Sequence, residues 1–248
     1  YDFIPFGPKT SAPITAKSWN GTIGKPPRPY TAHMAVSADA RAFAVAVSNE
    51  CVGHYITSET ADTYGCTWAT NGGLFSFAAP PAHVCIGALV VNGTAVSTPA
   101  DEYASIGLND SGIILGVGNV YEGYSQFIQG RGYLVRDGES YVNKSSDLDP
   151  KSGFVTEFAP RTAIGMIAKT NELVSVVVDG IEEHQVGVSL FEMADILIDQ
   201  GISHAINLDG GGSSDAVFHG KIFSKPTCHD TPVICERPVT SIACFRQQ

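Results

Sequence analysis

The segment 207–214 combines the groups best suited to chemistry in this sequence: one carboxylate, one amide, two hydroxyls and three consecutive glycines. Ala205, Ile206 and Leu208 predict that a buried strand ends here. Glycines let bare backbone approach a ligand closely, so this composition is typical of either a tight turn or a site for a polar or anionic ligand. The segment consists of Asn207, Leu208, Asp209, Gly210, Gly211, Gly212, Ser213 and Ser214.

Two other segments offer a cation and a second carboxylate at predicted strand ends. Arg161, followed by Thr162, stands at the start of an apolar strand. A positioned guanidinium is the best side chain for binding a phosphate or carboxylate through two hydrogen bonds. Asp179 follows the apolar run 173–178 in the way that Asp209 follows its own strand. We expect these two carboxylates to face one cleft if their strands are neighbours.

The remaining candidates have stronger structural explanations. Asn71, Gly72 and Gly73 also follow a predicted strand, although Asn-Gly is first of all a turn signal. Glu192 is a third candidate carboxylate, but a capping box with Ser189 accounts for it fully. The seven histidines form no metal-spaced cluster, and no lysine follows the glycines as a nucleotide-binding loop requires. We predict neither a metal nor a cofactor.

Short strands and one clear helix must position these groups. Residues 189–200 carry apolar side chains at helical spacing, and 173–178 predicts a central strand buried on both faces. Asn92-Gly93 and Asp137-Gly138 are hairpin turns. Further strands are predicted at 42–48, 87–91, 105–108, 112–117 and 133–136. The sequence therefore predicts an α/β (α+β) fold, with a mixed sheet and packed helices in a single compact, disulfide-stapled domain.

The proline pattern divides the chain into two parts. Six prolines fall within residues 1–30, which predicts an extended arm wrapped on the surface. We expect residues 31–248 to form the main domain, which carries all the candidate catalytic and binding residues. With 44% hydrophobic residues the chain has enough apolar material for a sizeable core.

Charge and hydropathy exclude two classes of partner. The formal net charge is −10 and no run of lysine or arginine occurs, which argues against nucleic acid as the main partner. No apolar stretch approaches the roughly 20 residues that a membrane span requires. Because the first residue is Tyr1 rather than Met, we expect that an N-terminal segment has been removed. The sequence leaves open whether the protein forms a homo-oligomer.

Sequons and cysteines point to the secretory pathway. Four sequons occur, and the six cysteines are even in number with no pair two residues apart, so they favour disulfides over a zinc or redox site. Cys228 and Cys235 are the natural local pair, while spacing leaves the other pairings open. The sequon asparagines are Asn20, Asn92, Asn109 and Asn143.

Five motifs occur in an order that resembles the phosphodiester glycosidase family, and the likeness runs from about Cys51 to Cys244. The cysteine placement and the stretch 125–127 agree with it. Leu74 stands where the family usually has an aromatic, and Ser214-Asp215 also departs from the family pattern. The motifs are 71–73 with an aromatic soon after, 161–165, Asp179-Gly180, 190–194 and 207–213.

The resemblance implies a hydrolase of the Golgi lumen or a secreted hydrolase. Such an enzyme removes terminal N-acetylglucosamine from a phosphate diester on the N-glycans of lysosomal glycoproteins and so exposes mannose 6-phosphate. The resemblance also implies the disulfides Cys51–Cys85, Cys66–Cys244 and Cys228–Cys235.

The chemistry assigns roles to the candidate residues. A sugar 1-phosphodiester has a good leaving group, so the site needs charge neutralisation, a carboxylate near the anomeric carbon and groups that orient the ring. We expect Asp209 to be the base or nucleophile and Asp179 the second carboxylate, with Glu192 able to replace either. Arg161 would bind phosphate. The expected supporting residues are Asn71, Gly72, Gly73, Thr162, Asn207, Gly210, Gly211, Gly212 and Ser213.

Two other functions use the same residues. A metal-assisted phosphodiesterase would place Asp179, Asp209 and Asn207 around a divalent cation. A secreted glycan-binding domain would use the pocket without turnover. A disulfide-stapled structural domain would not explain why polar residues gather at several predicted strand ends.

Overall fold

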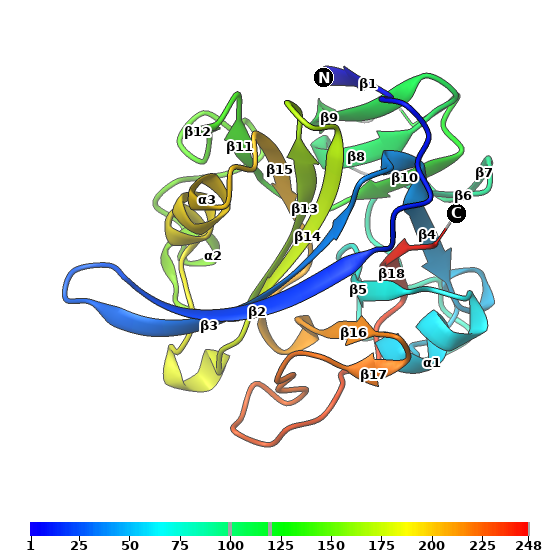
Figure 1. Ribbon diagram of the computed structural model, residues 1–248. Helices are drawn as coiled ribbons and strands as arrows, with labels where there is room; N and C mark the ends of the chain where they lie inside the picture. The colour runs from blue at the N-terminus through cyan, green and yellow to red at the C-terminus, as the bar shows by residue number, and fades with distance from the viewer. Residues whose placement is uncertain (99–100, 119–120, 248) are drawn as a thin grey trace.

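The computed structural model describes residues 1–98, 101–118 and 121–247, and three β-sheets dominate it (Figure 1). In the described residues every pairing between named strands is antiparallel. The predicted mixed sheet is therefore wrong for the described strands. The predicted α/β fold also overstates the helix content, because strands far outnumber helices. Most apolar runs are only three to ten residues long, which suits strands better than helices.

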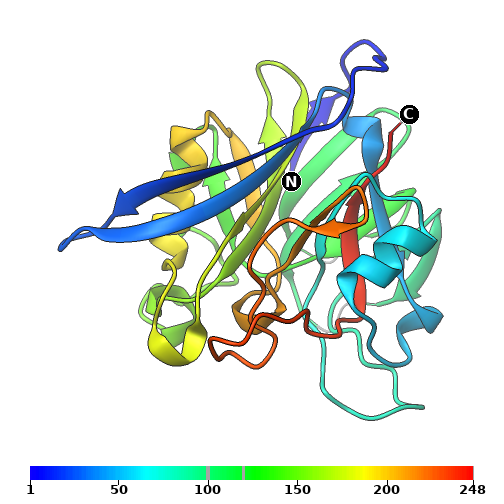
Figure 2. The same cartoon turned by 60° about the horizontal axis from the view of Figure 1, so that its bottom comes forward.

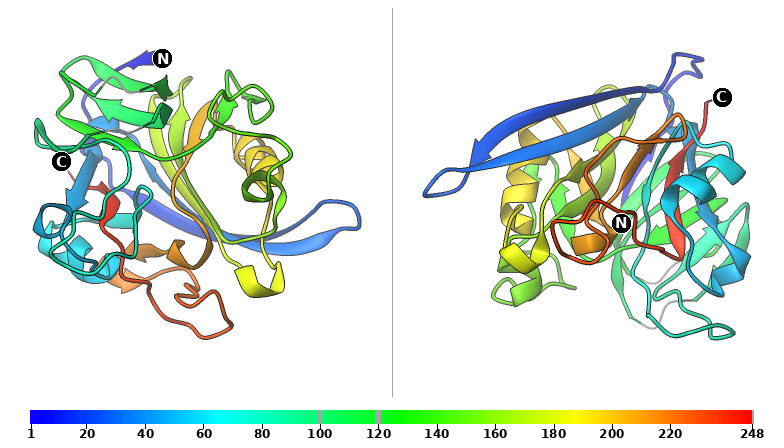
Figure 3. Two further views of the ribbon diagram at one scale, coloured as in Figure 1. Left: turned by 180° about the vertical axis from the view of Figure 1, so that it is seen from behind. Right: turned by 90° about the horizontal axis from the view of Figure 1, so that it is seen from below.

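The seven-stranded sheet carries the strands that end at the predicted carboxylates. In spatial order it contains β12 (Glu139–Ser140), β11 (Tyr133–Arg136), β15 (His204–Asn207), β13 (Arg161–Ile167), β14 (Glu172–Val178), β3 (Arg28–Ser37) and β2 (Thr15–Ile23). β14 is central and almost entirely buried, as predicted. β2 and β3 form a long hairpin whose tip extends past the rest of the molecule (Figures 2 and 3).

Two further sheets pack beside it. The six-stranded sheet contains β1 (Asp2–Pro5), β9 (Gly112–Gly118), β8 (Tyr103–Leu108), β10 (Gln126–Gln129), β6 (Leu89–Val91) and β7 (Thr94–Ser97). The five-stranded sheet contains β17 (Lys221–Ile222), β16 (Ala216–Phe218), β5 (Trp68–Asn71), β18 (Ser241–Phe245) and β4 (Phe43–Val47). The turns Asn92-Gly93 and Asp137-Gly138 join β6 to β7 and β11 to β12, which confirms both predicted hairpins.

The described helices are short. They are α1 (Thr57–Thr63), α2 (Gly153–Thr156) and α3 (Leu190–Asp199), with single 3-10 turns at Ala40–Ala42, Asn49–Cys51, Glu182–His184 and Gly211–Ser213. α3 is the predicted helix, and its capping box between Ser189 and Glu192 is confirmed. None of the described helices is long and apolar enough to cross a membrane.

Two hydrophobic clusters lie on opposite faces of the seven-stranded sheet. Val176, Met193 and Leu197 belong to the cluster beneath α3. Ile164 and Leu115 belong to the other, which fills the space toward the remaining two sheets. Both faces of the strands that lead to the site are therefore buried, which holds their ends rigidly.

Residues 1–30 are extended, but they are also paired into the sheets. They contribute β1, β2 and the first residues of β3, so the predicted division between residues 30 and 31 falls inside a strand. The prolines suggested an unpaired arm, but proline is tolerated at edge strands and at strand ends.

The described residues contain three disulfides. They are Cys51–Cys85, Cys66–Cys244 and Cys228–Cys235, the pairing that the family resemblance implies. Of the sequon asparagines, Asn20, Asn92 and Asn143 are exposed and Asn109 is partly buried. Their glycosylation stays a prediction.

Candidate functional site

Asp209 lies directly after β15, at the point where an apolar strand opens into the glycines. Its backbone N–H donates to the Gly72 carbonyl over 3.0 Å, and its carbonyl accepts from Asn71 Nδ2 over 2.7 Å. The two predicted turns, 71–73 and 209–212, therefore lie side by side. These bonds fix the backbone that presents the Asp209 carboxyl group.

Asn71 and Thr162 are buried supports of this arrangement. Asn71 is fully buried, and its Oδ1 accepts from the Thr162 hydroxyl at 2.7 Å and from the Asp215 amide at 3.2 Å. Asn207 is also fully buried, with its side-chain nitrogen donating to the carbonyls of Arg131 and Leu208. These hydrogen bonds connect strands, while the buried Oδ1 of Asn207 has no hydrogen-bond partner among the described residues.

The glycine amides are engaged within the protein. Gly72 and Gly73 donate to the carbonyl and hydroxyl of Ser241, at 2.8 and 3.1 Å. Gly211 donates to the Pro160 carbonyl and Gly212 to the Asp230 carboxylate, at 2.9 and 2.8 Å. The glycine N–H groups that were expected to bind a phosphate are therefore already hydrogen-bonded to acceptors within the protein.

Arg161 is the first residue of β13 and is only 1% exposed. Its Nε donates to the Val188 carbonyl, and its Nη2 donates to the carbonyls of Phe154 and Glu157. Burial lowers the pKa of this guanidinium, while nearby Glu157 and Glu182 oppose that shift. These bonds engage Nε and Nη2, while Nη1 lies near Gly210 of the glycine loop.

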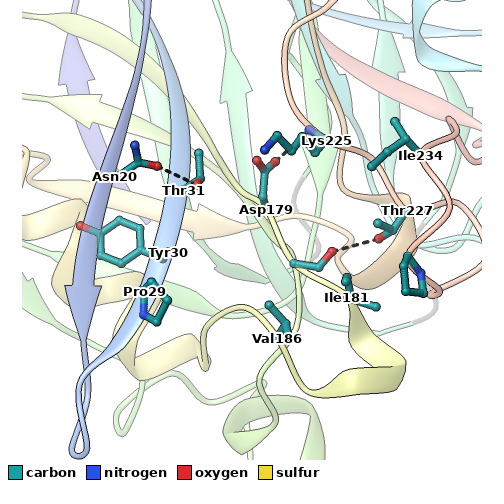
Figure 4. A pocket seen from close by; sticks show the side chains of 12 residues that line it. Asn20, Pro29, Tyr30, Thr31, Asp179, Ile181, Val186, Lys225, Thr227 and Ile234 are labelled. Carbon is teal, nitrogen blue, oxygen red and sulfur yellow. Dashed lines mark hydrogen bonds between the residues drawn. The ribbon is translucent and has the colours of Figure 1, made fainter.

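Asp179 is held away from Asp209. One carboxylate oxygen is 2.9 Å from His33 Nε2, and the other accepts from the Lys225 amide over 2.9 Å. It lines a separate cavity of about 370 Å³ between the β2–β3 hairpin and the segment after β17 (Figure 4). Glu192 caps α3 and forms a 2.6 Å ion pair with Arg28, so it too lies outside the Asp209 cluster.

Asp209 has the electrostatics expected of a reacting acid. Burial raises the pKa of its carboxyl group to about 6, although hydrogen bonds from the Ser213 side chain and the Gly210 backbone and the charge of Arg237 act in the opposite direction. The charge of Glu182 raises it further. Such a group exchanges protons near neutral pH, as general acids and bases must.

Glu182 is the second carboxylate of the cluster. A Cβ atom on Gly211 would collide with its carboxylate, and Gly211 has a φ of +58°, so only glycine suits that position. The pKa of Glu182 is raised by burial first, then by the charges of Asp230 and Glu157. The sequence offers little signal for this residue, because it lies in an irregular turn rather than at a strand end.

Arg237 is the cation of the cluster. Its Nη1 donates to the Ser213 hydroxyl over 3.3 Å, and its Nη2 forms a 2.6 Å ion pair with Asp230. Asp230 lies within the loop closed by Cys228–Cys235, and Arg237 follows that loop. Both residues border a cavity of about 430 Å³. The local disulfide was the one sequence signal near them.

The part of the chain that the structure describes holds one cluster of three potential metal ligands, namely Cys228, His229 and Cys235. The two cysteines of this cluster form a disulfide, so their sulfur atoms are not thiolate ligands. The metal-assisted alternative required Asp179 beside Asp209, and both carboxylate oxygens of Asp179 have other partners.

Comparisons with known proteins give a consistent result. A family model described as phosphodiester glycosidase matches residues 64–246. The chain is 34% identical over 207 residues to the N-acetylglucosamine-1-phosphodiester alpha-N-acetylglucosaminidases of Bos taurus and Homo sapiens. These matches cover 76% of this chain and 38 to 39% of those proteins, so the chain spans well under half of their length.

Several solved structures resemble this fold. The catalytic domain of zebrafish N-acetylglucosamine-1-phosphodiester alpha-N-acetylglucosaminidase, auto-inhibited by its pro-peptide, superposes with a TM-score of 0.86 at 25% identity, covering 100% of this chain and 88% of that one. A hypothetical protein from Synechocystis gives 0.70 at 14% identity, covering 93% and 61%. The second likeness concerns the fold alone.

Proposed function

Since this chain belongs to the phosphodiester glycosidase family, we propose that it hydrolyses N-acetylglucosamine 1-phosphodiesters. The substrate is N-acetylglucosamine-phospho-mannose on the N-glycans of lysosomal glycoproteins, and the product is exposed mannose 6-phosphate. The activity in the names of the relatives supports this proposal. Three disulfides are consistent with an oxidising compartment, and we propose the Golgi lumen or secretion.

One observation carries the proposal. The Asp209 carboxyl group, whose pKa burial raises to about 6, accepts from the Ser213 side chain, and the Ser213 hydroxyl accepts from Arg237. The Glu182 carboxylate lies against Gly211 of the same loop. The cluster also contains Asp230, which is ion-paired to Arg237. A carboxyl group that titrates near neutral pH, a second carboxyl group and a cation are what a glycosyl phosphodiester needs, because its leaving group is an anion and its anomeric carbon becomes electron-poor.

The proposed reaction breaks the bond between the anomeric carbon and the phosphate oxygen. The phosphate monoester leaves with the bonding electrons, and a water oxygen ends on the sugar. Ionised Asp209 acts at the anomeric carbon, either as the base that takes the water proton or as the nucleophile. Glu182 orients the sugar ring. If Asp209 is the nucleophile, Glu182 instead takes the proton of the water that hydrolyses the glycosyl-enzyme ester. Arg237 neutralises the phosphate, the role that the sequence suggested for Arg161.

Turnover of N-acetylglucosamine-phospho-mannose tests this assignment. The wild-type protein should release N-acetylglucosamine, with kcat/KM rising as pH increases through about 6 because ionised Asp209 is required. In ¹⁸O-labelled water the label should appear in the sugar. Label in the phosphate product would contradict cleavage at carbon. The anomeric configuration of the first product separates a base from a nucleophile.

A further inference from the structure

An aromatic group borders the cavity beside Arg237. Phe77 is 73% exposed, which is unusual for a large apolar side chain next to a cavity. Its ring lies 6.2 Å from that of His54, with an interplanar angle of 28°, and 5.1 Å from that of Phe75. We call Phe77 and His54 the aromatic platform.

The platform is held in place by its neighbours. His54 Nε2 lies 2.8 Å from the Ser76 carbonyl, so this nitrogen carries the hydrogen and donates it. Nδ1 of the neutral ring is then an acceptor, suited to a hydroxyl group. The loop that carries Phe75 and Phe77 is tied down by an isolated bridge between Phe75 and Cys85 and by the disulfide Cys51–Cys85.

A chain of contacts sets the order of the groups. The Ser213 side chain hydrogen-bonds to Asp209, and its hydroxyl also accepts from Arg237 Nη1 at 3.3 Å. The Arg237 guanidinium carbon then lies 5.7 Å from the centre of the Phe77 ring. The order is therefore carboxylate, guanidinium, aromatic platform. A ligand that places its anomeric carbon at Asp209 and its phosphate at Arg237 directs its remaining part toward Phe77.

We propose that the aromatic platform is the subsite for the acceptor sugar, the sugar on the far side of the phosphate from N-acetylglucosamine. This inference rests on the proposed function. The partly positive C–H groups of a pyranose face suit the electron-rich face of an aromatic ring. The adjoining cavity of about 430 Å³ lies within the size range of small-molecule sites. His54 Nδ1 accepts a sugar hydroxyl.

Two substrates with the same N-acetylglucosamine phosphate and different alcohols test the subsite. One is the mannose diester and the other is the methyl diester, which has nothing to place on the platform. Phe77→Ala should lower kcat/KM for the mannose diester by about tenfold, mainly through KM. It should change kcat/KM for the methyl diester by less than about twofold. Phe77→Tyr keeps a ring and should retain the mannose preference.

Phe3→Ala is the matched control, because Phe3 is another exposed phenylalanine, 53% exposed on β1. It should leave both substrates unaffected. Equal losses on both diesters in Phe77→Ala, or no loss on either, would overturn the subsite. Failure of the wild-type protein to hydrolyse either diester would instead overturn the proposed function, so the two failures are distinguishable.

Discussion

Asp179 and Asp209 end two buried strands that flank the same neighbour, and each is followed by a glycine. β14 and β15 both run antiparallel to β13, so they are parallel to each other and their aspartates reach the same edge of the sheet. Their surroundings nevertheless differ. Both oxygens of Asp179 have partners in His33 and the Lys225 amide, whereas burial raises the pKa of Asp209 to about 6.

The difference shows that a strand-end carboxylate becomes reactive through what surrounds it. β13 separates the two aspartates, and Asp179 turns toward the β2–β3 hairpin. Glu182, three residues later, turns back to the glycine loop and takes the place that Asp179 was expected to fill. Both carboxylates accept hydrogen bonds, so the difference lies in the desolvation of Asp209 and in the like charge of Glu182 beside it, which suit Asp209 to proton transfer.

The largest contrast is expected when each aspartate is replaced by asparagine. Asp209→Asn removes the carboxylate at the proposed reaction centre and should lower kcat about 1,000-fold or more. Asp179→Asn leaves that centre intact and should keep kcat within about tenfold. Initial rates on N-acetylglucosamine-phospho-mannose measure both, with circular dichroism to verify folding. Similar losses in the two variants would erase the distinction between the aspartates.

A second contrast lies within the turn after Asp179. Glu182→Gln removes the carboxylate near Asp209 and should lower kcat about 100-fold. Glu183 is its exposed neighbour, so Glu183→Gln serves as the matched control and should leave kcat nearly unchanged. The same rate assay measures both variants. If Glu183→Gln proved the more damaging change, Glu182 would have no place in the reaction.

The two Asp-Gly turns also differ in the space around their glycines. A Cβ atom on Gly180 would collide with the Val186 carbonyl oxygen, whereas the nearest atom to one on Gly210 is the Pro160 oxygen at 3.2 Å. Gly180→Ala should therefore cost about 2 to 3 kcal/mol of unfolding free energy, and Gly210→Ala less than about 1 kcal/mol. Urea denaturation gives both values. The reverse order would mean that the Asp209 turn is the more tightly packed one.

Stability should change in opposite directions in the two asparagine variants. The pKa of Asp209 is about 6 in the folded protein and near 3.8 ordinarily, so folding takes up a proton. Wild-type stability therefore falls as pH rises from about 4 to about 6. Asp209→Asn should be about 2 kcal/mol more stable than wild type at pH 7. Asp179→Asn should lose about 1 to 3 kcal/mol, because charged hydrogen bonds are lost.

Thermal melting at pH 4.5 and pH 7 measures these shifts. The stability that Asp209→Asn gains over wild type should be smaller at pH 4.5, where wild-type Asp209 is already protonated. A gain of the same size at both pH values would contradict a raised pKa as its cause.

Sequence predicted the parts that depend on near neighbours. The capping box needs only Ser189 and Glu192, and the hairpin turns need only two adjacent residues, so both follow from residue type. The family resemblance supplied the disulfides. Asp209 was proposed because an apolar strand and glycines surround it in the sequence.

The rest depended on distant contacts. Glu182 acquires its setting from Gly211, and Arg237 acquires its setting from Ser213 and Asp230, which lie 24 and 7 residues before it. Nothing in the local sequence specifies those encounters. In the same way, Arg161 looked free because its carbonyl partners at 154, 157 and 188 are brought to it only by folding.

The position of β18 has a consequence for the order of events during synthesis. This strand, residues 241–245, lies between β5 and β4 in the middle of the five-stranded sheet, and Cys244 joins it to Cys66. A ribosome releases the chain from its N-terminal end at about 5 to 20 residues per second. The edges of β4 and β5 that receive β18 must therefore wait unpaired until residue 245 has emerged. Such edges invite wrong pairing, so this part of the nascent protein is vulnerable until β18 arrives.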